Sequence, residues 1–149
     1  MEKMKVSTRG EYALRALILL GQRPNEVIPV GDISEKTLVP VNYLEQILLQ
    51  LKKLGYVTSK RGIRGGYTLR LPADQIVIGE VIRRLEGPLA PMGCVSVTAY
   101  EPCPLEEGCL LKPLWALIRD TVAHMLEHTT LKDLLQQHIS TGKERNRVK

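Results

Sequence analysis

The stretch from residue 41 to residue 70, VNYLEQILLQLKKLGYVTSKRGIRGGYTLR, decides the fold of this chain of 149 residues. In its first half, leucine and isoleucine recur at helical spacing, and Gly55 stands where a helix C-cap is expected. Its second half holds two short segments rich in β-branched and aromatic residues, YVTS and YTLR, joined by KRGIRGG. The stretch therefore predicts a helix followed by a β-hairpin with a basic, glycine-rich tip.

Two further helices are expected before this stretch. The segment STRGEYALRALILLGQ has a broad apolar face that ends at Gly21, and Thr8 with Glu11 fits a capping box at its start. The segment GDISEKT is suited to a short second helix. Three helices followed by a hairpin is the order of a winged helix-turn-helix domain, which we place at residues 1–87. The predicted fold class is mainly α with a small β-hairpin.

The basic residues gather in the first half of the chain. The net charge is +5, yet residues 1–70 carry 12 Lys and Arg against 6 Asp and Glu, whereas residues 71–149 carry 9 against 10. Between Lys52 and Arg70 there are six basic residues and no acidic one. Such a density suits a polyanion such as the nucleic-acid backbone, although a charge run taken alone more often marks a solvated face.

In a winged helix-turn-helix domain the third helix enters the major groove, and the wing lies against phosphates or reaches the minor groove. The amides of Asn42 and Gln46 can recognise adenine, and Glu45 can accept a hydrogen bond from cytosine N4. Asn42 and Glu45 have a second interpretation as a capping box, and a winged domain can also dock a protein partner. The candidate DNA-binding residues from the pattern are Asn42, Glu45, Gln46, Lys53, Lys60, Arg61, Arg64 and Gly65.

The second half of the chain is expected to contain three more helices around a loop. IVIGEVIRRLEG predicts a helix, and residues 88–111 hold four prolines without periodicity. Residues 112–139 contain a long helix, KPLWALIRDTVAHMLEH, and a second one started by a capping box of Thr130 with Asp133. The long helix lies beyond a domain that closes without it. Its apolar stripe is therefore expected to meet a second copy, and residues 112–139 are expected to form the dimerisation helices of a homodimer.

No apolar run approaches the length of a membrane span, and the N-terminus lacks the pattern of a signal peptide. We therefore expect no membrane association and a cytoplasmic location. The polar segment STGKERNRVK, residues 140–149, is expected to be a disordered tail.

All three cysteines of the chain, Cys94, Cys103 and Cys109, lie within the loop at residues 88–111. In the reducing cytoplasm, clustered cysteines are more often metal ligands or redox groups than structural disulfides. The open interpretations are an iron-sulfur cluster, a zinc site, a thiol-disulfide switch or the use of small residues in a loop. No Cys–His pairing or nucleophile motif is present, so an enzyme is not expected.

Seven features resemble, in their joint order, the Rrf2 family of bacterial transcription regulators, and within it the iron-sulfur cluster regulators. They are STRGEYALRAL, YLEQIL, RGIRGGYTL, VIRRLEGPLAP, the three cysteines, LW and TTLKDL, which span about Met4 to Leu135. The resemblance implies a homodimeric winged-helix regulator of operator DNA, often a repressor, that senses iron, redox state or nitric oxide through a bound cluster. By position, it implies that Tyr43 joins the residues facing the major groove and that Gly62 serves the wing with Arg61.

The resemblance also bears on the ligands of a 2Fe-2S or 4Fe-4S cluster. The gaps between the cysteines are eight and five residues, whereas family members often have five in both. In the iron-sulfur cluster regulators a histidine three residues after the last cysteine completes the site, but Lys112 stands there in this chain. In other cluster-bearing relatives an acidic residue in the first helix of the opposite subunit is a ligand, and Glu11 aligns with it. The resemblance thus implies Cys94, Cys103, Cys109 and Glu11 from the partner subunit as the ligand set.

Overall fold

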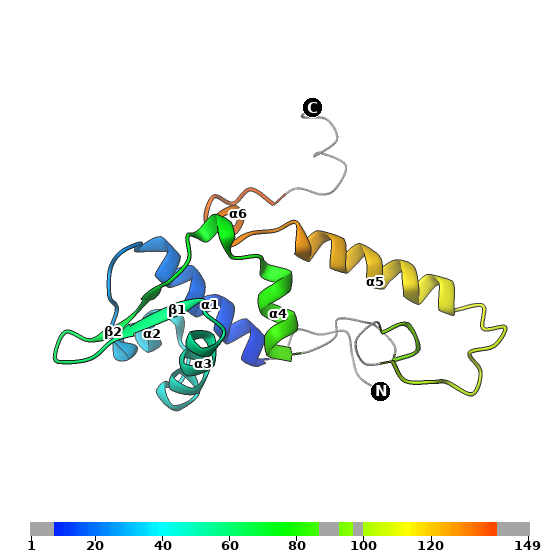
Figure 1. Ribbon diagram of the computed structural model, residues 1–149, viewed down its shortest axis with the longest axis horizontal. Helices are drawn as coiled ribbons and strands as arrows, with labels where there is room; N and C mark the ends of the chain where they lie inside the picture. The colour runs from blue at the N-terminus through cyan, green and yellow to red at the C-terminus, as the bar shows by residue number, and fades with distance from the viewer. Residues whose placement is uncertain (1–7, 87–92, 97–99, 140–149) are drawn as a thin grey trace.

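The computed structural model describes residues 8–86, 93–96 and 100–139, and the predicted polar tail at residues 140–149 lies outside this part. The described part is mainly helical with one two-stranded antiparallel sheet, which confirms the predicted fold class (Figure 1). None of its helices is long and apolar enough to cross a membrane. The elements in chain order are α1 (Thr8–Gln22), α2 (Val30–Thr37), α3 (Val41–Lys53), β1 (Val57–Lys60), β2 (Gly66–Leu69), η1 (Ala73–Gln75), α4 (Ile78–Glu86), η2 (Gly93–Val95), α5 (Lys112–Glu127) and α6 (Leu131–Leu135).

Helix α1 lies in the core, and two predictions about its ends need correction. The helix runs through Gly21 to Gln22, and Gly21 packs closely against α6: a Cβ there would lie 2.8 Å from Leu135 Cδ1. Thr8 is itself helical, and the Glu11 carboxylate accepts a hydrogen bond from Arg15 at 3.0 Å rather than closing a capping box with Thr8. The glycine thus serves close helix packing and does not end the helix.

Helix α3 buries Leu44, Leu48 and Leu51 against α1 and α2. Its N-cap is Pro40, without a side-chain cap, so the predicted capping box of Asn42 with Glu45 is wrong. Its end follows the prediction. Gly55 has a φ of +88°, and the amides of Gly55 and Tyr56 donate to the carbonyls of Lys52 and Leu51. This Schellman arrangement turns the chain directly into the wing.

The wing is the hairpin of β1 and β2, in which Val57 pairs with Leu69 and Lys60 pairs with Gly66. It projects from one end of the molecule (Figure 1). Its base is fixed to the segment before α2, because Ile28 and Tyr67 exchange two backbone hydrogen bonds of 2.9 Å. The wing is therefore part of the same folded unit as the three helices.

The chain returns to this unit after α5. Leu131 of α6 is fully buried in the core that α1, α3 and α4 form, and its amide donates to the carbonyl of Ile76 at 2.8 Å. The predicted capping box of Thr130 with Asp133 is confirmed. Residues 131–135 thus complete the core of the winged domain, while α5 extends away from it (Figure 1). The expectation that the winged domain is complete without the residues after the long helix is therefore wrong, because Leu131 of α6 belongs to its core.

Candidate nucleic-acid interface and cysteine segment

The predicted recognition residues share one exposed face of α3. Asn42, Tyr43, Glu45 and Gln46 are exposed, while Leu44 between them is fully buried. Positions three and four residues apart lie on the same side of a helix, so these side chains form one continuous surface near the N-terminus of α3. Since the α3 cap uses none of their polar groups, this surface presents two amides, a carboxylate and a phenol to a partner.

The tip of the wing carries the predicted cations in exposed positions. Lys60, Arg61 and Arg64 are exposed, as is Lys53 at the end of α3. Gly62 has a φ of +112°, and the Gly65 amide donates to the Gly62 carbonyl at 2.9 Å. A Cβ on Gly65 would lie 2.3 Å from the Lys60 carbonyl oxygen, so this turn requires glycine. The tip is thus a tight basic turn.

Two exposed residues of this surface escape sequence reasoning. Ile63 is fully exposed between Arg61 and Arg64, although it is a large apolar residue. Lys52 donates a hydrogen bond from Nζ to Ser59 Oγ at 2.6 Å and so links α3 to β1. The charge run beginning at Lys52 was the available signal for it, but only the fold shows that this lysine turns toward the wing.

The three predicted cysteine ligands are unpaired thiols in separate positions. Cys94 in η2 and Cys109 before α5 are half-buried, and Cys103 is exposed. Within residues 8–86, 93–96 and 100–139, no three His, Cys, Asp or Glu side chains lie together as a metal site requires. Glu11 is exposed on α1 and paired with Arg15. One chain therefore does not by itself bring the four predicted ligands together.

Glu106, which sequence reasoning missed, organises the segment around Cys103 and Cys109. Its carboxylate accepts hydrogen bonds from Lys112 and from Tyr100, its amide donates to the Cys103 carbonyl at 3.0 Å, and its carbonyl accepts from the Cys109 amide at 3.1 Å. The bond from Lys112 lowers the pKa of Glu106, and the same bond raises the pKa of Lys112. Lys112 is thus held as an ammonium ion, which agrees with its exclusion as a ligand.

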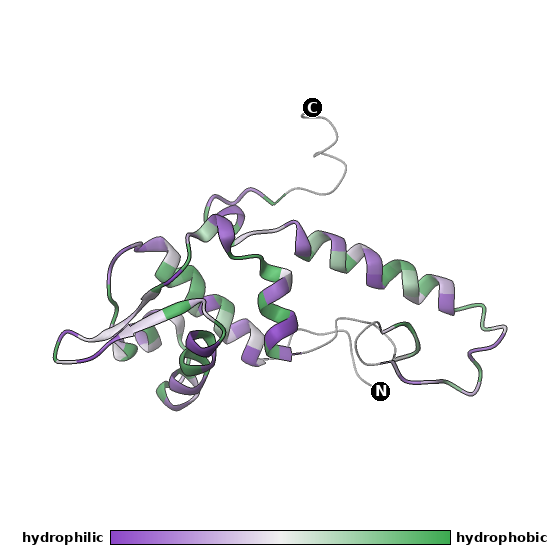
Figure 2. Ribbon diagram, viewed as in Figure 1, coloured by the Kyte–Doolittle hydropathy of each residue, from purple (hydrophilic) through white to green (hydrophobic). Residues whose placement is uncertain are grey.

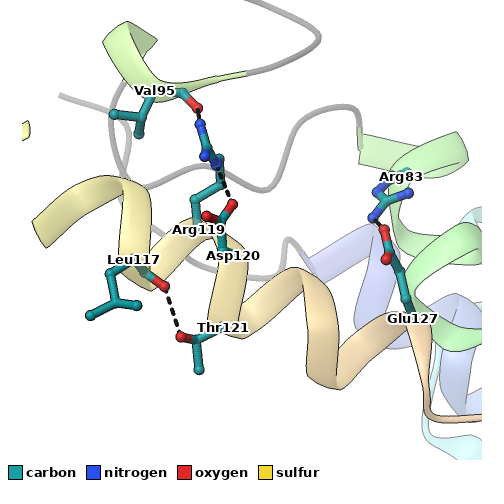
Figure 3. Close-up of polar contacts among 7 residues, drawn as sticks. All are labelled: Arg83, Val95, Leu117, Arg119, Asp120, Thr121 and Glu127. Atoms are coloured by element: carbon teal, nitrogen blue, oxygen red, sulfur yellow. Dashed lines mark hydrogen bonds and ion pairs between the residues drawn. The ribbon is translucent and has the colours of Figure 1, made fainter. Parts of the chain in front are cut away.

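Helix α5 contacts both the cysteine segment and the winged domain (Figure 3). Arg119 donates from Nη1 to the carbonyl oxygen of Val95 at 2.7 Å, and Val95 is buried directly after Cys94. Near the other end of α5, Glu127 forms an ion pair with Arg83 of α4. One rigid helix therefore joins the backbone next to Cys94 to the winged domain.

Known proteins match this arrangement along most of the chain. The Rrf2 family model, described as an iron-dependent transcriptional regulator, matches residues 6–137. The HTH-type transcriptional regulator CymR of Bacillus subtilis is 38% identical over 136 residues, which cover 88% of this chain and 89% of CymR. The HTH-type transcriptional regulator IscR of Erwinia tasmaniensis is 33% identical over 133 residues, covering 89% of this chain and 79% of IscR.

The solved structure of CymR, named there as the global cysteine regulator of B. subtilis, superposes with a TM-score of 0.76. It is 36% identical and is matched over 89% of this chain and 97% of that chain. These relatives confirm the predicted winged-helix fold and the prediction of a DNA-binding regulator that is not an enzyme. The chain belongs to the Rrf2 family of transcriptional regulators.

Proposed function

We propose that this regulator is a homodimeric repressor that binds operator DNA and senses iron, redox state or nitric oxide through an iron-sulfur cluster on Cys94, Cys103 and Cys109. The observation that carries the sensing role is the position of the cysteine segment. It docks through Val95 onto α5, the helix that is also paired with the winged domain. A chemical change at these thiols therefore occurs beside the element that leads to the DNA-binding surface. As a regulator of DNA, the protein is expected in the cytoplasm.

The DNA-binding role uses the two exposed surfaces described above. The α3 face of Asn42, Tyr43, Glu45 and Gln46 offers the donors and acceptors that distinguish base edges in the major groove. The cations of the wing supply contacts to phosphates or to a narrow minor groove. A protein partner at the same surface is a competing possibility. Two results favour DNA: an affinity that falls steeply as the salt concentration rises, and a lower affinity in Arg61→Ala than in the wild type.

The donor chemistry of the cysteine segment fits an iron-sulfur cluster. Thiolates are the usual ligands of such clusters, and the family description names iron. When bound, a cluster supplies iron–thiolate bonds that oxidation and nitric oxide can break. The residues of this chain have separate tasks: Glu106 closes the turn between Cys103 and Cys109, and Arg119 holds the backbone beside Cys94. The three thiols are not gathered in the part of the chain that the structure describes, so assembly of the site requires a rearrangement of the cysteine segment, with Glu11 of the partner subunit proposed as the fourth ligand.

The second candidate is a thiol-disulfide or zinc-dependent regulator of the same fold. The free cysteines and the 38% identity to CymR favour it. The two candidates differ in what the purified protein contains. Under this second candidate, DNA affinity follows oxidation of the thiols or zinc content in protein without iron.

Anaerobic purification after iron-replete expression separates the candidates. The wild type is expected to be brown, with iron and sulfide counted in equal amounts, and Cys103→Ala is expected to lose the colour. Leu105→Ala, at an exposed position of the same segment, is the matched control and keeps it. Glu11→Ala tests the fourth ligand by its effect on the absorption spectrum. A colourless wild-type protein with stoichiometric zinc would eliminate the cluster.

The homodimer is proposed from the open face of α5. No residue of this helix is fully buried, and Leu114, Leu117 and Met125 are 48%, 63% and 41% exposed along one side. Figure 2 shows apolar residues along the length of α5. A second copy would cover this stripe and remove apolar area from water. Leu117→Glu is expected to give a monomer in sedimentation equilibrium, whereas Gln136→Glu, at an exposed position directly after α6, leaves the dimer intact.

A further inference from the structure

A cleft of about 370 Å³ lies along the wing, between its basic tip, the end of α3 and the start of α2. Its lining contains three cations, one serine, three glycines, one tyrosine and one aliphatic side chain, and no acidic residue. The lining residues are Val30, Lys52, Ser59, Lys60, Arg61, Gly62, Gly65, Gly66 and Tyr67. The composition of this cleft suits an anion.

Two of the lining groups have positions fixed by the fold. Lys52 is oriented by its hydrogen bond to Ser59, so its ammonium ion lies at the cleft with donors to spare. Gly66 cannot carry a side chain, because a Cβ there would lie 2.2 Å from the carbonyl oxygen of Ile28. The cleft is therefore lined partly by bare backbone, which allows a ligand to approach the chain closely.

The start of α2 adds a further positive element. Val30, the first residue of this helix, lines the cleft, and its N-cap Pro29 provides no side-chain hydrogen bond to the first turn. The amides of a first helical turn have no partner within the helix, and the helix dipole makes this end positive. Asp32 is the acidic residue of that turn, and it does not line the cleft.

We propose that this cleft binds a phosphate group of the DNA backbone, with Lys52 and Ser59 as its side-chain ligands. The proposal rests on the DNA-binding function and adds to it a DNA contact located between the recognition helix and the wing. A phosphate held there would fix the position of the duplex relative to α3, because contacts to phosphates set register while contacts to base edges set specificity.

The salt dependence of DNA binding tests the proposal. The probe is a duplex selected by the wild-type protein from a random-sequence pool, and affinity is measured by fluorescence anisotropy at several salt concentrations. Loss of one phosphate contact lowers the slope of log affinity against log salt by about 0.9 per protomer. Lys52→Ala is expected to show this loss. Lys36→Ala removes one exposed cation from α2 outside the cleft and is expected to keep the wild-type slope.

A scan of the duplex with neutral methylphosphonates identifies the phosphate. A methylphosphonate at one position of the duplex should weaken DNA binding by the wild type. The same substitution should not further weaken DNA binding by Lys52→Ala. Lys52→Gln keeps the test valid if the alanine variant unfolds, since glutamine removes the charge and retains a polar side chain with a hydrogen-bond donor. The proposal would be overturned if both Lys52 variants kept the wild-type salt slope. It would also be overturned if Lys36→Ala lowered the slope as much as Lys52→Ala does.

A separate titration distinguishes DNA from a free phosphorylated ligand. Inorganic phosphate is added without DNA, and the amide signals of Gly62, Gly65 and Gly66 are followed by nuclear magnetic resonance. Saturation at low phosphate concentration, together with an unchanged salt slope in the Lys52 variants, would assign the cleft to a free phosphate compound and overturn the DNA contact. If the wild type selects no duplex from the pool, the DNA-binding function itself fails, and the phosphate titration still reports on the cleft.

Discussion

Gly66→Ala is expected to detach the base of the wing. Gly66 is the first residue of β2, and a Cβ there would lie 2.2 Å from the carbonyl oxygen of Ile28 and 2.7 Å from the nitrogen of Pro29. Ordinary van der Waals contact begins near 3.4 Å, and both clashing atoms belong to the backbone. The wing must therefore move away from residue 28, which breaks the two hydrogen bonds between Ile28 and Tyr67.

The contacts around Gly66 give the magnitude of the effect. Two lost backbone hydrogen bonds cost about 1 kcal/mol each. Overpacking adds about 1–3 kcal/mol, and the reduced backbone freedom of the unfolded chain returns about 1 kcal/mol. The free energy of unfolding is therefore expected to fall by about 2–4 kcal/mol. DNA affinity is expected to fall as well, because the wing and its cleft are displaced.

Urea unfolding at fixed protein concentration and anisotropy with duplex DNA measure the two effects. Gly31→Ala is the matched control, since a Cβ on Gly31 would meet nothing within 4 Å, and its free energy of unfolding should change by no more than about 1 kcal/mol. If Gly66→Ala has the same free energy of unfolding and the same DNA affinity as Gly31→Ala, the contact with Ile28 does not anchor the wing.

Two further predictions concern the core. Leu131→Ala should lower the free energy of unfolding in urea by about 2–5 kcal/mol, because Leu131 is fully buried. Leu110→Ala, at a position 93% exposed, should change it by less than about 0.5 kcal/mol. Similar values for the two variants would show that α6 is not part of the core. Tyr56→Phe should stabilise by about 1 kcal/mol, because the buried Tyr56 hydroxyl has no hydrogen-bond partner among the described residues. Burial also raises the pKa of Tyr56, so the folded state keeps this proton to a higher pH than the unfolded chain does. The stability that this difference contributes is present below about pH 10 and should be lost as the pH rises through the folded pKa. This part of the loss should be absent in Tyr56→Phe.

Local patterns were sufficient for the elements that local interactions define. The apolar spacing of α3, the glycine after it and the β-branched and aromatic residues of the hairpin strands all act within a few residues, and the predicted elements are confirmed. Predictions about helix ends were less successful. Asn42 with Glu45 has the spacing of a capping box, but Pro40 is already compatible with the N-cap, and the helix starts one residue before Asn42. Spacing alone cannot choose between two possible starting residues.

Contacts between distant residues explain the remaining differences. Gly21 stands near the end of an apolar pattern and so resembles a helix stop, whereas its neighbours in space are Leu131 and Leu135, more than a hundred residues later in the chain. The role of Glu106 was equally hidden, because a carboxylate in a loop without periodicity gives no sign of which amide, lysine or phenol it will meet. The arrangement of the cysteines depends on this network, and their spacing in sequence does not determine it.

The packing of α4 limits how a change at the cysteines can reach the DNA. A Cβ on Gly79 of α4 would lie 2.9 Å from the backbone carbon of Leu126, so α4 and α5 are in close contact as well as joined by the ion pair of Arg83 with Glu127. On its other side, α4 buries Val81 and Ile82 in the core shared with α1 and α3. Closely packed cores do not deform continuously. Under the proposed function, a shift of the segment beside Cys94 is therefore expected to move the winged domain as a unit with α4, and to alter the spacing of two domains in a dimer while leaving the recognition surface of α3 unchanged.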